Sequence, residues 1–114
     1  MKDDLLFVEH MLESVRRIQE YTVGGKDAFS SNTMLQDAVM RNLQVLAESS
    51  KRISAFRQDE FAQIPWRQIA GFRNVAVHEY LHIELQYIWE IVSMDLPNLK
   101  HQLEILRGKL LPRQ

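Results

Sequence analysis

The chain has 114 residues, of which 46 % are hydrophobic and 25 % charged, a composition typical of a globular domain and unlike that of a disordered or fibrous protein. Its formal net charge is −1 and it contains no cysteine, which excludes a disulfide framework, a thiol nucleophile and a thiolate metal site. The longest apolar run, Leu5 to Val8, is too short for a membrane span or for the core of a signal peptide. We therefore expect a single domain over residues 1–114 that resides in the cytoplasm and has no contact with a membrane.

Apolar residues recur at steps of three and four along most of the chain, which predicts an all-α protein. The first helix is expected to be capped by Asp3 or Asp4 and to end at Gly24-Gly25. A second helix is expected to start from the polar residues 30–33 and to fade near Ala55.

The second half of the chain predicts two further long helices. Residues 57–64 are expected to be polar and irregular, and Pro65 is expected in the first turn of the third helix. The fourth helix is expected from about Leu81, and Pro97 either kinks it or separates it from a short final helix. Four to five helices joined by short loops predict an up-down bundle, in which Trp66 and Trp89 anchor the core or an interface.

The segment from Ile64 to Tyr80 concentrates arginine, asparagine, histidine and tyrosine among apolar residues. On an ideal helix Asn74 lies about 100°, His78 about 140° and Tyr80 about −20° from Arg73. Arg73 and His78 therefore do not point the same way on one straight helix. Joint action of the two requires either a bend or a second subunit.

Histidine and arginine together are suited to metal-free RNA cleavage. A histidine titrates near neutral pH and can move a proton to or from a 2′-hydroxyl or a leaving oxygen. An arginine presents a planar fork of donors that stabilises the charge on a pentacoordinate phosphorus. By themselves the two residue types are also common as a solvated or ion-paired couple on an amphipathic helix.

The whole-chain pattern resembles the HepT family, the ribonuclease toxins of HEPN/MNT toxin–antitoxin pairs. The family motif of Arg, four residues, His, one residue and Tyr reads here as Arg73 to Tyr80. Three further segments look like family signatures, namely the lead-in 64–72, Tyr21-Thr22 before a glycine, and the run 41–48. In helix 2 this chain departs from the Gly-Glu-Ala of many members, because it has Ala47-Glu48-Ser49.

The resemblance implies a HEPN-like bundle that acts as a metal-independent endoribonuclease on tRNA or mRNA, without a cofactor. It implies a homodimer, with or without higher assembly with the antitoxin, in which Arg73 and His78 are the catalytic pair and Asn74 is their polar neighbour. It further implies a type VII toxin–antitoxin system, in which an MntA-type nucleotidyltransferase antitoxin silences the toxin by transferring AMP to Tyr80. Negative charge and bulk added beside an anion-binding arginine explain such inhibition physically.

Two alternatives from other classes fit the same sequence. His78 to His82 also spells H-E-x-x-H, the helical zinc signature, for which His101 or Glu104 would supply a third ligand. The extended form of that signature fails, because Leu85 and Ile88 stand at its Gly and His positions. The second alternative is a non-catalytic dimeric partner or substrate-binding subunit of a nucleotidyltransferase.

Other polar residues carry weaker expectations. Arg67 and His82 are expected as additional RNA contacts, although Arg67 is equally expected to form an ion pair with Asp59 or Glu60. His10 is expected to be a surface histidine. The basic pairs Arg16-Arg17 and Lys51-Arg52 are expected to be solvated helix faces rather than phosphate-binding tracks.

Overall fold

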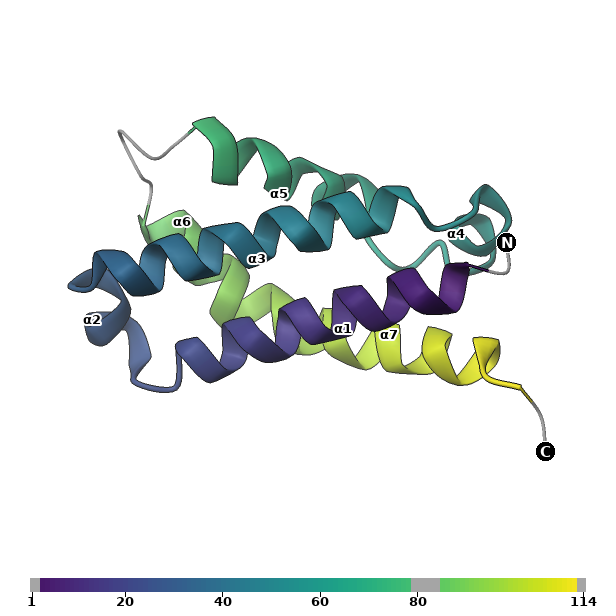
Figure 1. The fold of residues 1–114 in the computed structure, drawn as a ribbon, viewed down its shortest axis with the longest axis horizontal. Helices are drawn as coiled ribbons and strands as arrows, with labels where there is room; N and C mark the ends of the chain where they lie inside the picture. The colour runs from purple at the N-terminus through teal and green to yellow at the C-terminus, as the bar shows by residue number, and fades with distance from the viewer. Residues whose placement is uncertain (1–2, 79–84, 113–114) are drawn as a thin grey trace.

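The long helices of the protein lie side by side and run in alternate directions (Figure 1). The computed structural model describes residues 3–78 and 85–112, and all regular secondary structure within these ranges is helical. The long helices are α1 (Asp4–Tyr21), α3 (Thr33–Lys51), α5 (Trp66–His78) and α7 (Leu96–Leu110). The predicted all-α, up-down bundle is confirmed.

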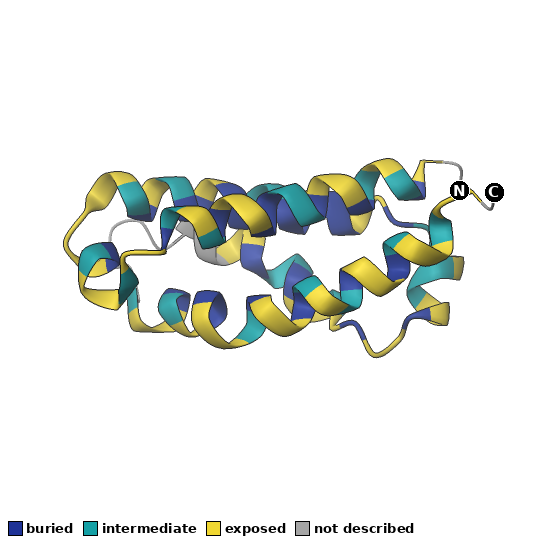
Figure 2. Cartoon of the chain, turned by 90° about the horizontal axis from the view of Figure 1, so that it is seen from below, coloured by how far each residue is buried: buried dark blue, intermediate teal, exposed yellow. Residues whose placement is uncertain are grey.

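Helix α3 is the central element, because it packs against α1 on one side and α5 on the other, while α7 packs against α1. The buried side chains follow the apolar stripes that the sequence predicts, as the inward-facing blue bands of Figure 2 show. Val39, Leu43 and Leu46 of α3 are fully buried. Ile69 and Phe72 attach α5 to the same core, which fixes the helix that carries the motif.

The start of α1 is held by a contact that the sequence does not reveal. Asp3 occupies the cap position, but its side chain makes no capping hydrogen bond. Asp4 is instead buried, and its carboxylate accepts hydrogen bonds from the backbone N–H of Ser54 at 2.9 Å and from Ser54 Oγ at 2.7 Å. The N-terminus of the bundle is thereby tied to the segment after α3.

Two short helices were not predicted from the sequence. Helix α2 (Gly25–Ser30) follows α1 at once, and Gly25 adopts the left-handed φ of +90° that favours glycine. Helix α4 (Ala55–Glu60) is capped by Ser54, whose Oγ accepts from the N–H of Arg57. The expectation of irregular structure over residues 57–64 is therefore wrong for its first half, and the second long helix ends at Lys51 rather than near Ala55.

The starts of α3 and α5 agree with the sequence signals, whereas α1 ends at Tyr21 rather than at Gly24-Gly25 and the expected helix start near Leu81 lies outside the described residues. Asn32 caps α3, with its side chain accepting from the N–H groups of Met34 and Leu35. Pro65 immediately precedes α5, and its carbonyl accepts from the N–H of Ile69 at 3.0 Å.

Both tryptophans are half-buried against the core, as predicted. Trp66 donates through Nε1 to the carbonyl of Phe61 at 3.1 Å. The ring of Trp89 lies 5.6 Å from that of Phe29, which joins α6 (Leu85–Glu90) to α2.

The region around Pro97 is a change of helical pitch rather than a break. Helix α6 (Leu85–Glu90) continues into a π-helical turn, η1 (Ile91–Asp95), and then into α7, with Pro97 in its first turn. Proline cannot donate to the carbonyl four residues earlier, and a π-turn is one way in which a helix absorbs such a missing bond. Within the described ranges no helix is both long and apolar enough to cross a membrane.

We predict that Asp4→Ala lowers the free energy of unfolding by about 2 kcal/mol, because it leaves the Ser54 N–H and hydroxyl without their acceptor. Urea denaturation monitored by circular dichroism measures this loss. Asp3→Ala is the matched control, since it removes the same charge from the same helix end but no hydrogen bond. Equal midpoints for the two variants would contradict the assignment of Asp4.

Candidate functional site

The predicted motif lies in the second half of α5 and in the segment that follows. Arg73 and Asn74 are exposed on α5, and the backbone of His78 forms its last helical residue. Tyr80 and His82 lie outside the described residues, so their predicted roles rest on the sequence. Phe72, which is buried, anchors this half of α5 against α3.

Arg73 faces Glu48 of α3. Its Nε lies 4.0 Å from Glu48 Oε1, and both side chains are 52 % exposed. Gln44 also donates to Glu48 Oε1, at 3.3 Å. Ion pairs at this exposure contribute about 0–1 kcal/mol to the free energy of unfolding, so Glu48 holds the guanidinium only weakly. Arg73 therefore retains donors for an external anion.

The Ala47-Glu48-Ser49 departure from the family pattern is accommodated by this packing. Ala47 is fully buried and Ser49 nearly so, while α3 still packs closely against α5. Glu48 between them is exposed and faces Arg73. Glu48, whose role the sequence left open, thus lies beside the motif arginine.

Helical register separates the candidate residues into two faces of α5. The helix is regular as far as His78, so the positions of Arg73 and His78 lie about 140° apart around its axis. Arg67, Asn74 and His78 occupy positions within about 40° of one another, whereas Arg67 is about 120° from Arg73. Arg67 therefore lies on the face of Asn74 and His78 rather than on that of Arg73.

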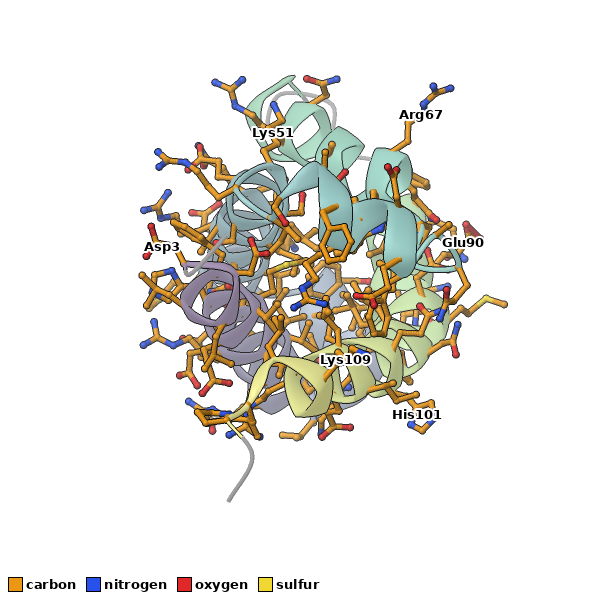
Figure 3. All side chains as sticks on the ribbon, turned by 90° about the vertical axis from the view of Figure 1, so that its right-hand side faces the viewer. Asp3, Lys51, Arg67, Glu90, His101 and Lys109 are labelled. Carbon is orange, nitrogen blue, oxygen red and sulfur yellow. The ribbon has the colours of Figure 1, made fainter. Side chains whose placement is uncertain are left out.

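Arg67 points away from the bundle (Figure 3) and lines an open groove of about 470 Å³ between α3, α4 and α5. Lys51 lines the same groove. The alternative expectation of an ion pair with Asp59 or Glu60 is not met, since Glu60 pairs with Arg57 at 2.7 Å and with Lys109 at 3.8 Å. Sequence reasoning missed Lys51 as a companion of Arg67 because the two come from different helices.

Metal ligands are not assembled in the described part of the chain. Residues 3–78 and 85–112 contain no cluster of three or more His, Asp or Glu side chains that could hold a metal ion. His101 and Glu104, the candidates for a third zinc ligand, are both exposed on α7. Residues 79–82 of the H-E-x-x-H sequence lie outside the described residues.

Comparison with known proteins identifies the family. The family model described as ribonuclease HepT-like matches residues 11–106, which include the buried stripes of α1, α3 and α7 and the motif on α5. The chain belongs to the ribonuclease HepT-like family. No solved structure matches it.

Three curated relatives show the extent of the HepT-like similarity. A protein of Thermococcus cleftensis named "Probable ribonuclease HepT" is 32 % identical over 89 % of this chain and 93 % of its own length. A candidate RNase of Methanocaldococcus jannaschii is 32 % identical over 92 % of this chain and 97 % of its own length. A second M. jannaschii protein, named as a gamma-glutamylcyclotransferase and candidate RNase, is 33 % identical over 90 % of this chain, which spans only 46 % of that relative.

Proposed function

We propose that this HepT-like protein is a metal-independent endoribonuclease. The observation that carries the proposal is Arg73, an arginine of the family motif that stands exposed on α5 and whose one ion pair among the described residues is with a half-exposed carboxylate. The family match and the names of the relatives support RNA as the substrate. We also infer that residues 1–114 act as one domain in the cytoplasm, where tRNA and mRNA are found.

In the proposed reaction the RNA itself supplies the nucleophile. The 2′-oxygen attacks the adjacent phosphorus while the bond to the 5′-oxygen breaks, which yields a cyclic phosphate and a free 5′-hydroxyl. His78 takes the proton from the 2′-hydroxyl and returns one to the leaving oxygen. Arg73 stabilises the added negative charge on phosphorus, and the exposed amide of Asn74 offers hydrogen bonds to the same group.

The 140° separation of Arg73 and His78 supports a site shared between two copies of the chain. One straight helix cannot direct both residues at a single phosphate, whereas two copies of α5 related by a twofold axis bring an arginine from one protomer to a histidine from the other. A homodimer is therefore part of the proposal.

We expect purified wild type to fragment bulk tRNA or mRNA, and Arg73→Ala or His78→Ala to reduce the rate by at least ~100-fold, because each removes charge stabilisation or proton transfer. Gel analysis of the RNA measures the rates. Arg73→Ala should change the free energy of unfolding by less than about 1 kcal/mol, since its ion pair is exposed.

The same experiment separates the alternatives. A substrate with a 2′-deoxy sugar at the cut site should resist cleavage, while EDTA should have no effect. Loss of activity on EDTA treatment would indicate the zinc site at His78 and His82 instead. An inert wild type would favour the non-catalytic partner of a nucleotidyltransferase.

A mixing experiment tests the shared site. When Arg73→Ala and His78→Ala proteins are unfolded together and refolded, half of the dimers are mixed, and each mixed dimer has one intact composite site. About a quarter of wild-type activity should therefore return. Each variant refolded alone is the control. Absence of any recovery would show that the two residues act within one chain, while leaving the nuclease assignment intact.

We also propose that the protein is the toxin of a type VII toxin–antitoxin system and that Tyr80 is the residue its MntA-type nucleotidyltransferase modifies with AMP. The support is the motif position of Tyr80, two residues after His78. An AMP group there would add a phosphate to the anion site that Arg73 serves.

We expect the cognate nucleotidyltransferase and ATP to increase the mass of the wild type by whole AMP groups and to stop RNA cleavage. Tyr80→Phe should cleave RNA and remain unmodified, because it lacks the acceptor oxygen. Intact-mass spectrometry and the RNA gel provide the two readings. Modification of Tyr80→Phe would assign the acceptor to another residue.

A further inference from the structure

A second basic surface lies on the opposite flank of α3 from Arg73. His10 and Arg17 of α1 and Arg41 of α3 line an open groove of about 330 Å³ between these helices. Both arginines are exposed, and the groove also contains Asn42, whose side chain is only 8 % exposed. We propose that this groove, hereafter the α1–α3 groove, binds the phosphate backbone of the RNA substrate away from the cut site. The inference rests on the proposed ribonuclease function.

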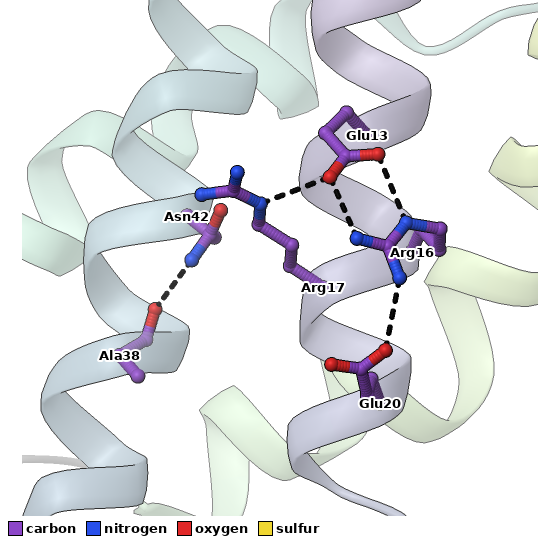
Figure 4. Close-up of polar contacts among 6 residues, drawn as sticks. All are labelled: Glu13, Arg16, Arg17, Glu20, Ala38 and Asn42. Atoms are coloured by element: carbon purple, nitrogen blue, oxygen red, sulfur yellow. Dashed lines mark hydrogen bonds and ion pairs between the residues drawn. The ribbon is translucent and has the colours of Figure 1, made fainter.

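One hydrogen bond holds Arg17 in position, and the other donors of its guanidinium are not used by described residues. Its Nε donates to Glu13 Oε2 at 3.0 Å, and its guanidinium reaches across from α1 toward Asn42 of α3 (Figure 4). No hydrogen bond is found for its two terminal nitrogens within the described residues. Those nitrogens form the fork that binds a phosphate through two parallel bonds.

Glu13 offsets one of the two arginine charges that line the groove, but not both. Hydrogen bonds from Arg16 and Arg17 lower the pKa of Glu13 to about 2, so its carboxylate stays ionised and committed to these two partners. Arg16 is itself shared between Glu13 and Glu20 along α1, on the side away from Asn42 (Figure 4). Arg41 forms no ion pair with any described residue, which leaves Arg17 and Arg41 as the cations that face an incoming anion.

The neutral polar groups of the groove suit a ribose-phosphate chain. The Nδ2 of Asn42 donates to the carbonyl of Ala38 at 2.9 Å, and the amide oxygen is left to accept from a ribose hydroxyl. Ser14, buried on α1, lines the same groove. Arginine forks beside hydroxyl and amide groups are typical of sites that bind a nucleic-acid backbone.

The groove lies across one helix, α3, from the candidate active site. Arg41 precedes Glu48 by seven residues, so the two lie on the same exposed face of α3 about 10 Å apart along its axis. Helices α3 and α5 run in opposite directions (Figure 1), so this displacement from Glu48 toward Arg41 is the direction in which α5 runs from Arg73 to His78. A single RNA strand that leaves the motif over α3 therefore meets Arg41 first and Arg17 next.

The test compares two pairs of substitutions that remove equal charge. Arg17→Gln with Arg41→Gln clears the groove, whereas Lys26→Gln with Lys109→Gln removes two exposed cations outside it. Glutamine keeps a similar helix propensity. Both pairs are made in the His78→Ala background, and binding to a fluorescein-labelled oligouridylate of about twenty nucleotides and to bulk tRNA is measured by anisotropy as a function of salt.

We expect the groove pair to raise the Kd for at least one of these RNAs roughly tenfold and to reduce the salt slope by about 1.4 for the single strand, since each phosphate contact contributes about 0.7. The control pair should change Kd less than twofold. In the His78-intact protein the groove pair should raise KM for RNA cleavage with kcat unchanged, because the groove is remote from the reacting phosphate.

The possible outcomes separate this inference from the proposed function. Equal effects of the two pairs, with wild-type cleavage intact, would overturn the groove assignment alone. Weaker RNA binding accompanied by a smaller sedimentation coefficient would also overturn it, because the groove would then be a contact between copies of the chain. Wild-type protein that neither binds nor cleaves RNA would overturn the proposed function and the groove with it.

Discussion

The burial of α3 on two sides is the constraint on which the rest of the structure depends. Its buried residues cover roughly half of the helix circumference, which lets α1 and α5 pack on opposite flanks of one helix. The remaining half is a polar ridge that includes Arg41 and Glu48. Because the ridge separates two grooves, each flank of α3 presents a different set of side chains to solvent, and a ligand that crosses α3 can contact both.

The same constraint explains why α5 is a suitable carrier for the motif. Ile69 and Phe72 are buried, whereas Arg67, Arg73 and Asn74 are exposed, so the helix is anchored along one stripe and free on the others. Because apolar residues anchor α5, its exposed polar residues are not needed to hold the helix in place. The weak Arg73–Glu48 pair illustrates this, since it sets the direction of the guanidinium at little energetic cost to either partner.

Local patterns predicted the long helices because their apolar spacing and end signals, such as Asn32 and Pro65, lie within a few residues of the structure they specify. The short helices α2 and α4 could not be predicted in this way. Six residues are too few for a periodic stripe, and α4 is stabilised partly by Asp4, which is 50 residues from Ser54 in sequence. Long-range contacts of this kind leave no local signal.

The candidate site likewise has features that follow from local sequence and features that depend on contacts between distant residues. The Arg73–His78 spacing is local, and the helical angle between the two positions follows from the sequence alone. The angle also predicts that Arg67 belongs with Asn74, a conclusion that needed only the same arithmetic. By contrast, the α1–α3 groove joins Arg17 to Arg41, and the sequence gives no indication that two isolated arginines from separate helices line one surface.

A net charge of −1 is compatible with RNA binding when cations are concentrated on particular surfaces. Several of the acids that neutralise the total charge are committed to other partners, as Glu13 is to Arg16 and Arg17 and Glu60 to Arg57. If two copies of the chain share the active site, RNA cleavage also depends on the concentration of the chain, because the site forms only in the dimer. In that arrangement the separation of Arg73 from His78 on one helix keeps a lone chain inactive, so the geometry of α5 itself couples cleavage to assembly.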